Sequence, residues 1–514
     1  MAEAKPKEQS GMEALAIGSA YAFFGAILSK IFTYLYRLVV AGAGPEAYGI
    51  ISLGISVVII LVTVGLLGLG EGITRFIPEY KQTNRQSEIK GTITFSFKVG
   101  LIVGAIFTLL LFFGAEQLAI GLFHEPGLVS VFQILSGAII PFMLLTLIVY
   151  VFTAFENVKL IVYSKHLTEN ITRLALTYLL LYLGQGIIGA ALAYTLASIA
   201  TFILAFYWLE TKVFPLIRTK IVSKVQRSEI LNFSLPLLLS GMMWTTLVWA
   251  DTIILGIVRN AHDVGIYNAA APTAMILVAV PQIVLAIFTP LVTRLHTQGK
   301  MQELEEIYKR SMKWILIMAL PIATLFFAFS RSVVYQLFGP QYLSASLSLS
   351  ILSVGYLIYN AFIGSESLIR LSKRTDIILG IAAITMISNI ILSFFLSQRY
   401  GSIGSAVATA FALALYVILN TIVAYKFTKI HPLEFNQLRP IGATLLAAGF
   451  IFSATKLIPI LPLNIPLLVF AYFAAYFIFT VAFKALDAED IKIIKSVSKR
   501  AIARLPFGER FQNF

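Results

Sequence analysis

Five side chains in apolar stretches of this chain could together bind an anion. Lys30 and Arg37 are seven residues apart, and therefore on one face of a helix, with Tyr34 between them. Lys98 and Arg173 lie in two later apolar stretches. An ionisable group at membrane depth costs about 3 kcal/mol by insertion scales, so each indicates a cavity or a partner. Arg grips a phosphate through two hydrogen bonds and Lys contacts it as a point charge, which predicts a binding face for a phosphate or pyrophosphate.

Two of these cations also have a structural interpretation. Arg37 lies near the expected outer end of its segment, where a long side chain can reach the interface. Glu169 precedes Arg173 by four residues, which is the spacing of an ion pair within one helix. Lys30 lies near mid-depth and has no such alternative.

Two carboxylates occupy equivalent depths in the second half of the chain. Asp251 and Glu366 either bind a coupling Na⁺ or proton, or pair with a Lys or Arg of the facing half. Pairing is slightly favoured, because a lone carboxylate in a dry site takes up a proton. Polar side chains accompany them at Asn268, Gln282, Asn360 and Asn389.

Signatures of enzymes and of resident metals are missing. The chain has no cysteine, and its five histidines show neither an HExxH motif nor paired metal-ligand spacing. It also lacks a GxxxxGK[ST] phosphate loop. We therefore expect no catalytic residue, no metal site, no enzyme activity and no cofactor apart from a coupling Na⁺ or H⁺.

These side chains are positioned by helices that cross a membrane. Of 514 residues 58% are hydrophobic and 12% charged, against about 25% charged in soluble domains. Apolar runs of about 20 residues, enough to cross the hydrocarbon core, recur along the chain. They predict an all-α membrane protein with fourteen spans, at 12–41, 47–78, 89–114, 127–154, 160–183, 187–208, 229–257, 263–292, 311–330, 342–369, 375–397, 403–427, 438–458 and 463–484.

The distribution of cations sets the orientation. Most of the 39 Lys and Arg residues fall in alternate loops between these segments, which places those loops and both termini in the cytoplasm. The net charge of +14 is explained by these loops, so we expect no nucleic-acid partner. The first segment has no signal-peptide cleavage pattern and is expected to remain in a cell-membrane protein.

A weak internal repeat divides the chain into two parallel lobes. GPEAYGI and HDVGIYN place Gly49 opposite Gly265, and each is followed by a long segment and a Thr-Arg exit. The predicted parts are a cytoplasmic segment 1–11, an N-lobe 12–208, a basic linker 209–228, a C-lobe 229–427, two further helices in 428–484 and a basic tail 485–514. The tail is expected to be either an amphipathic helix on the inner leaflet or a solvated basic extension.

The sequences GPEAYGI, VGLLGLGEGITRFIPEY and DVGIYNAA resemble the polysaccharide transporter branch of the MOP exporter superfamily, whose members include Wzx-like oligosaccharide-lipid flippases. The resemblance covers essentially the whole chain and implies a MATE-like fold of two pseudo-symmetric six-helix lobes plus two C-terminal helices. It implies translocation of a polyprenyl-(pyro)phosphate-linked oligosaccharide by alternating access, in contact with membrane lipids and alongside glycan-assembly enzymes.

Three alternatives stay open. A MATE-like multidrug antiporter is disfavoured, because the resemblance would then imply acidic residues where Lys30 and Arg37 stand. A lipid II flippase is the second alternative, because the sequence does not exclude lipid II as the substrate. A membrane glycan polymerase or ligase is disfavoured by the short outer loops.

Overall fold

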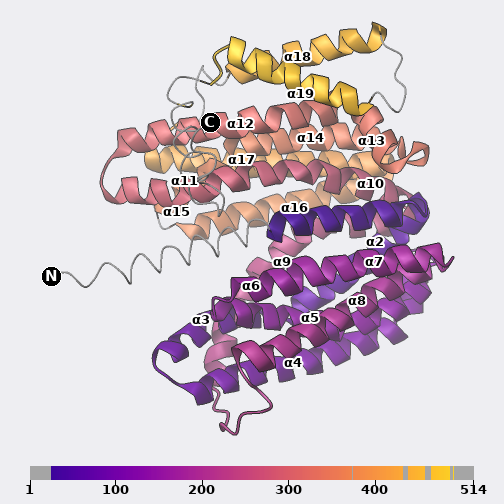
Figure 1. Cartoon of the computed structure of the whole chain (residues 1–514), viewed down its shortest axis with the longest axis vertical. Helices are drawn as coiled ribbons and strands as arrows, with labels where there is room; N and C mark the ends of the chain where they lie inside the picture. The colour runs from indigo at the N-terminus through magenta and orange to yellow at the C-terminus, as the bar shows by residue number, and fades with distance from the viewer. Residues whose placement is uncertain (1–24, 373, 432–437, 458–464, 487–489, 491–514) are drawn as a thin grey trace, which may run out of the picture. The chain divides into compact units, whose positions relative to one another are not determined.

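The structure is a computed structural model and describes residues 25–372, 374–431, 438–457, 465–486 and 490. The predicted cytoplasmic segment 1–11 and nearly all of the tail 485–514 lie outside the described residues. Helices make up most of the described chain, in which there is no strand (Figure 1). After a helix over 25–41 come α2 Pro45–Gly65, α3 Leu69–Gln82, α4 Gln86–Phe113, α5 Leu128–Ala154, α6 Val158–Ile161, α7 Glu169–Tyr182, α8 Gly186–Trp208, α9 Arg227–Val258, α10 Ala261–Ala274, α11 Ala279–Thr297, α12 Met301–Ala328, α13 Ser330–Phe338, α14 Ala345–Phe362, α15 Gly364–Leu371, α16 Thr375–Tyr400, α17 Ser402–Thr428, α18 Leu438–Leu457 and α19 Ile465–Ala482.

The described part of each of the fourteen predicted spans corresponds to one helix or to consecutive helical pieces. Nine helices in the described part of the chain are long and apolar enough to cross a membrane. The protein is therefore a multi-pass membrane protein, as predicted. Large apolar side chains are exposed along α4 from Leu101 to its end, including Ile102 and Leu110, each 61% exposed, as expected where lipid replaces water.

Several spans are interrupted instead of continuous. The second span breaks between α2 and α3, where Gly68 has a φ of +71° that favours glycine. The eighth breaks at Met275–Val278, a 3₁₀ turn between Pro272 and Pro281, and proline removes a backbone hydrogen bond of the helix. Both interruptions therefore fall at residues that weaken a continuous helix.

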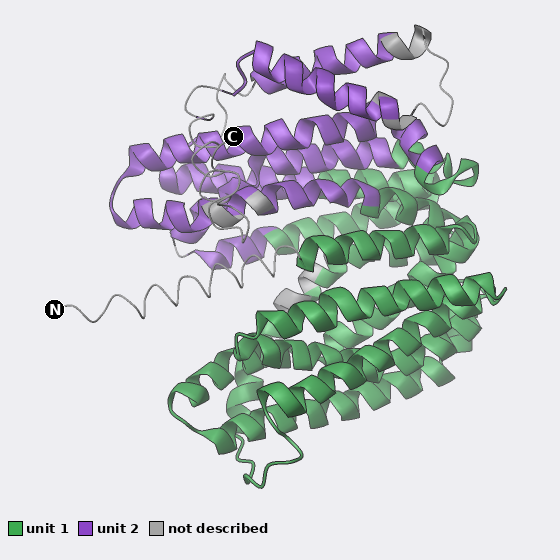
Figure 2. Cartoon of the chain, viewed as in Figure 1, with its two compact units in different colours: residues 1–272, 337–348, 382–412 green, residues 273–336, 349–381, 413–514 purple. Residues whose placement is uncertain are grey.

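Contacts divide the chain into two compact units (Figure 2). Unit 1 comprises residues 1–272, 337–348 and 382–412, and unit 2 comprises 273–336, 349–381 and 413–514. The six-helix lobes stay a prediction.

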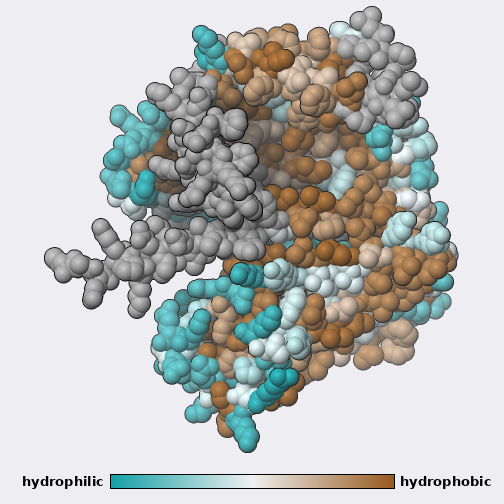
Figure 3. Space-filling model, viewed as in Figure 1, coloured by the Kyte–Doolittle hydropathy of each residue, from teal (hydrophilic) through white to brown (hydrophobic). Residues whose placement is uncertain are grey.

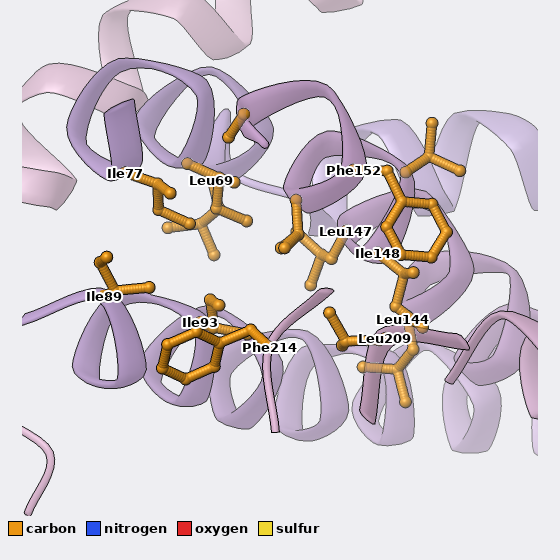
Figure 4. Close-up of a cluster of buried hydrophobic side chains, with 14 of the residues drawn as sticks. Leu69, Ile77, Ile89, Ile93, Leu144, Leu147, Ile148, Phe152, Leu209 and Phe214 are labelled. Atoms are coloured by element: carbon orange, nitrogen blue, oxygen red, sulfur yellow. The ribbon is translucent and has the colours of Figure 1, made fainter. Parts of the chain in front are cut away.

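Unit 1 has an apolar core between α3, α4 and α5. Ile73, Ile93, Leu147 and Phe152 are fully buried there, and the chain following α8 contributes Phe214 (Figure 4). Burying each such side chain stabilises the fold by about 1.5–3 kcal/mol. On the face shown in Figure 3, hydrophilic side chains gather where α3 meets α4.

In unit 2 the last two described helices pack on each other and on α12. Ala443 and Ala447 of α18 meet Tyr472 of α19 in a small buried cluster. The hydroxyl of Tyr476 donates to the Ile317 carbonyl at 2.8 Å. Further along, the buried carboxylate of Asp490 accepts from Lys313 Nζ at 2.5 Å and Trp314 Nε1 at 2.8 Å, and so joins the chain beyond α19 to α12.

The repeated glycines lie at the crossing of α2 and α10, both in unit 1. A Cβ atom on Gly49 would lie 1.7 Å from the Ala261 carbonyl oxygen, and one on Gly265 would lie 1.8 Å from that of Pro45. Each glycine thus meets the residue four positions before the other, so the two contacts are reciprocal. The two glycines that indicated the repeat in the sequence are thus the residues at which its two copies touch.

Replacing Gly49 by Ala should destabilise the protein. The new methyl group has a backbone atom in its way, and such overpacking costs about 1–3 kcal/mol or more. Thermal unfolding of the purified protein in detergent should show a lower Tm. Gly380 of α16 provides the matched control, since nothing lies within 4 Å of its would-be Cβ and Ala suits a helix better. A Gly49→Ala protein as stable as Gly380→Ala would contradict the close crossing.

Candidate functional site

Asp251 of α9 is the centre of a buried polar cluster in unit 1. Its carboxylate is 2% exposed and accepts hydrogen bonds from Tyr267 at 2.9 Å and from Thr409. Asn389 Nδ2 donates to the other oxygen at 3.4 Å. These donors come from α10, α17 and α16, so the cluster exists only when four helices are packed together.

The cluster also contains oxygen atoms without partners. The Asn389 Oδ1 and Ser393 Oγ atoms are buried and make no hydrogen bond. Ser393 faces Asp251 but is outside hydrogen-bond geometry. It stands one turn after Asn389 on α16, so both side chains lie on one face of that helix. Buried polar atoms without partners indicate a bound water or ion.

No Lys or Arg among the described residues pairs with Asp251. One of the two interpretations left open by the sequence, pairing with a cation of the facing half, therefore has no support in the described chain. A carboxylate surrounded by neutral oxygen-bearing groups at membrane depth is suited to a proton or a monovalent cation.

A chain of hydrogen bonds leads from Arg37 toward this cluster. Arg37 Nη1 donates to the Tyr48 hydroxyl at 3.3 Å, which donates to the Asn268 carbonyl at 3.1 Å. The Asn268 amide in turn donates to Thr252 at 3.3 Å. Asn268 and Thr252 directly follow Tyr267 and Asp251 in sequence, so the helix over 25–41 and the carboxylate are joined through α2 and α10.

Arg173 belongs to a second cluster in unit 1. It is 9% exposed and forms an ion pair with Glu169 on its own helix, α7. Its guanidinium also lies over the Tyr194 ring, 4.5 Å from the centroid, and 5.7 Å from that of Tyr36. Glu169 neutralises the Arg173 charge, which the sequence had left as one of two interpretations.

Asn170 fastens the same helix to the helix over 25–41. It accepts from Thr33 Oγ1 and donates to Ser29 Oγ, each at 3.0 Å. It also donates to the His166 carbonyl at 3.0 Å, within the π-helical segment Val162–Thr168 that precedes α7. The wider π-helical turn leaves carbonyl groups in need of a donor, and the Asn170 amide supplies one.

The structure does not bring the remaining predicted anion-binding residues together in one cluster. Lys30 is exposed and makes no ion pair among the described residues, and Tyr34 is half-buried. Lys98 is exposed on α4, whose apolar neighbours Leu101 and Ile102 are also exposed.

Glu366 lies in unit 2 on α15, after the break that ends α14. It pairs with Arg370 one turn further along α15, at 3.1 Å from Nε, and accepts from the Tyr416 hydroxyl at 2.9 Å. Tyr416 stacks on Tyr359 with ring centroids 6.5 Å apart. The sequence analysis did not identify this local partner, because the predicted span ends at residue 369, just before Arg370.

The sequence reasoning also missed Tyr48, Tyr267, Ser393 and Thr409. Ser393 had a usable signal, because a polar residue one turn after Asn389 in an otherwise apolar segment shares its face. Tyr267 and Thr409 had none, since isolated hydroxyl groups are common in membrane helices.

Known structures share this arrangement of helices. The chain is similar to the lipid II flippase MurJ in an inward closed conformation, with a TM-score of 0.69 and 18% identity over 91% of this chain and 98% of that one. It is also similar to an inward-facing multidrug resistance MATE family transporter of the MOP superfamily, with a TM-score of 0.62 and 17% identity over 78% of this chain and 94% of that one. The fold is thus that of a helical MOP-type membrane protein, as predicted.

The family follows from the sequence. A model described as polysaccharide biosynthesis protein matches residues 15–296, and a MatE model matches 236–395. The chain belongs to the polysaccharide biosynthesis protein family, which confirms the resemblance seen in GPEAYGI and DVGIYNAA. An uncharacterised membrane protein of Methanocaldococcus jannaschii is 25% identical over 94% of this chain and 98% of its own length. The probable low-salt glycan biosynthesis flippase Agl15 of Haloferax volcanii is 24% identical over 54% of this chain and 58% of its own.

Glu169–Arg173 and Glu366–Arg370 have the same spacing but differ in burial, so they test how burial changes the contribution of an ion pair to stability. Arg173→Gln should destabilise the protein by about 3–5 kcal/mol, because it leaves Glu169 buried without a partner. Arg370→Gln is the control, since the Arg370 side chain is 58% exposed and such pairs contribute about 0–1 kcal/mol. Unfolding in detergent measures both, and Glu169→Gln combined with Arg173→Gln should restore part of the loss. Equal stability of the two single variants would contradict a neutralising role for Glu169.

Proposed function

We propose that this protein is a flippase that carries a polyprenyl-(pyro)phosphate-linked oligosaccharide across the cytoplasmic membrane by alternating access. The observation that carries the proposal is the family match over residues 15–296, together with the probable flippase Agl15 among the relatives. The described part of the chain consists of helices and short connections, which favours a transporter over a polymerase or ligase. The proposal includes no catalytic step, and in it both termini lie in the cytoplasm, the orientation that the distribution of cations favours.

The phosphate of the substrate would be held by Lys30 and Arg37. Neither forms an ion pair among the described residues, and the partner of Arg37 is the neutral Tyr48 hydroxyl, so both charges are available to an anion. Arg173 contributes less, because Glu169 already balances its charge. Tyr34 would line the same helix, and Lys98 would lie further out at the lipid boundary.

Asp251 would couple flipping to a gradient of Na⁺ or H⁺. Its carboxylate has neutral donors around it, and two buried oxygen atoms beside it lack partners. Binding of a cation or a proton would remove the uncompensated charge, and so would change which packing of α9, α10, α16 and α17 is favoured.

A MATE-like antiporter is the second candidate, supported by the MatE match over 236–395. It would export a cationic compound, whereas Lys30 and Arg37 repel one. Lipid II remains an alternative lipid-linked substrate and is compared directly in the assay below.

Charge reversal of Lys30 should abolish flipping. Proteoliposomes carrying a fluorescent lipid-linked oligosaccharide report flipping as the fraction of label that a membrane-impermeant reductant destroys. Lys30→Glu should repel the phosphate and reduce the rate to that of empty vesicles, while Lys426→Glu, at an exposed cation on α17, should not. Unchanged activity of Lys30→Glu would refute the phosphate-binding role. Lipid II and a cationic dye in the same vesicles distinguish the alternatives.

Asp251→Asn should remove the stimulation of flipping by an imposed gradient. The amide can neither release a proton nor balance a cation, so we expect stimulation to fall at least about tenfold, as for loss of a coupling free energy of about 1.4 kcal/mol. Separate Na⁺ and pH gradients identify the ion. The control is Asp376→Asn, an exposed carboxylate of α16. Full stimulation in Asp251→Asn would exclude coupling at this site.

A further inference from the structure

The basic linker before α9 is held against the start of α4. Phe214 is 5% exposed within the core of unit 1 (Figure 4), and the Glu210 carboxylate accepts from the backbone N–H groups of Leu216 at 2.8 Å and Ile217 at 2.9 Å. The linker backbone is therefore fixed where it leaves α8.

Two further hydrogen bonds hold the rest of the linker. Lys90 Nζ of α4 donates to the Thr219 carbonyl, and the Lys224 N–H donates to the Ser87 carbonyl, each at 2.9 Å. A Cβ atom on Gly91 would lie 1.8 Å from the Lys224 carbonyl oxygen, so the two backbones touch. The chain between 214 and 226 is thus an ordered strap without helix, and Figure 1 shows it looping past the N-terminal end of α4.

This strap exposes apolar and cationic side chains together. Ile217 is 75% exposed and Val222 74% exposed, which is more than most lipid-facing residues of α4. Arg218, Lys220 and Lys224 are also exposed between and beside them, and residues 214–226 include no Asp or Glu. Contact of these two apolar side chains with water is unfavourable, and an apolar environment would remove that cost.

The position of the strap indicates what covers these side chains. It contacts Lys90 and Gly91, and α4 exposes Leu101 and Ile102 about 15 Å further along, at 1.5 Å per residue. The strap therefore lies beside a lipid-facing helix, near the depth at which lipid headgroups begin. Amphipathic segments rich in Lys and Arg bind that layer through apolar insertion and attraction to anionic lipids.

We propose that linker residues 214–226 bind the surface of an anionic phospholipid bilayer, with Ile217 and Val222 inserted among the headgroups and Arg218, Lys220 and Lys224 against lipid phosphates. The strap is a lipid-binding site separate from the substrate path, and it anchors the connection between α8 and α9 to the membrane. This inference goes beyond the proposed flippase function and does not depend on it.

The absence of cysteine from the whole chain permits a direct test. Single variants Ile217→Cys and Val222→Cys are labelled with an environment-sensitive fluorophore and reconstituted in vesicles of phosphatidylcholine with or without phosphatidylglycerol. Both labels should shift to the blue and be quenched by lipids that carry a nitroxide near the headgroup, more strongly with phosphatidylglycerol. Gln82→Cys, at an exposed polar position ending α3, is the matched control and should stay accessible to aqueous iodide.

The cations are tested in the Ile217→Cys background. Each Lys or Arg near an anionic surface contributes about fivefold to binding, so Arg218→Gln, Lys220→Gln and Lys224→Gln together should lower insertion into phosphatidylglycerol vesicles about 100-fold. Iodide quenching at 217 and 222 equal to that at 82 would overturn the proposal. Protection from iodide without quenching by nitroxide lipid would also overturn it, because it indicates a protein partner. Insertion independent of lipid charge would refute the role of the cations.

Discussion

Every charge within the apolar helices has to be stabilised by the protein, because lipid cannot hydrate it. The structure meets this constraint in three ways. Arg173 is neutralised by Glu169 on its own helix and lies over aromatic rings. Asp251 receives hydrogen bonds from neutral donors of neighbouring helices. Arg37 donates to a tyrosine that is itself joined to α10. The packing of these helices therefore depends on polar groups as well as on apolar surface.

These local partners reduce the difference in charge between the two halves of the chain that the sequence indicates. The sequence places the candidate cations in the first half and the candidate anions in the second, yet Arg173 and Glu366 each have an opposite charge four residues away. Of the charges predicted to bind an anion or a coupling ion, those without an opposite charge beside them in the described chain are fewer, namely Lys30 and Arg37 on one helix, Lys98 on α4 and Asp251 on α9. A single bound substrate or ion can balance a few such groups, whereas it could not balance a cavity lined with many charges.

Much of the fold could be predicted from sequence because membrane helices have a strong local signal. Length and apolar composition identified a helix for every predicted span, and motifs identified the family. The interruptions of the helices were harder to predict. The composition around Gly68 predicts one continuous span, whereas the structure has a break there. The Asp251 cluster was harder still, since Tyr267 and Thr409 are brought to the carboxylate by packing between helices distant in sequence. Local pairs such as Glu366 with Arg370 could have been found from spacing, had the end of the helix been placed correctly.

The reciprocal approach of Gly49 and Gly265 has a consequence for the history of the chain. Because each glycine meets the residue four places before the other, the crossing has the self-complementary form of an isologous dimer interface. An ancestor of half the length could have assembled as a two-fold symmetric pair around a single glycine, used once by each subunit. Duplication and fusion would preserve that interface while freeing its two halves to diverge. The surroundings have done so: the position after Ile50 holds isoleucine in the first copy, whereas its counterpart in the second is Tyr267, a ligand of Asp251.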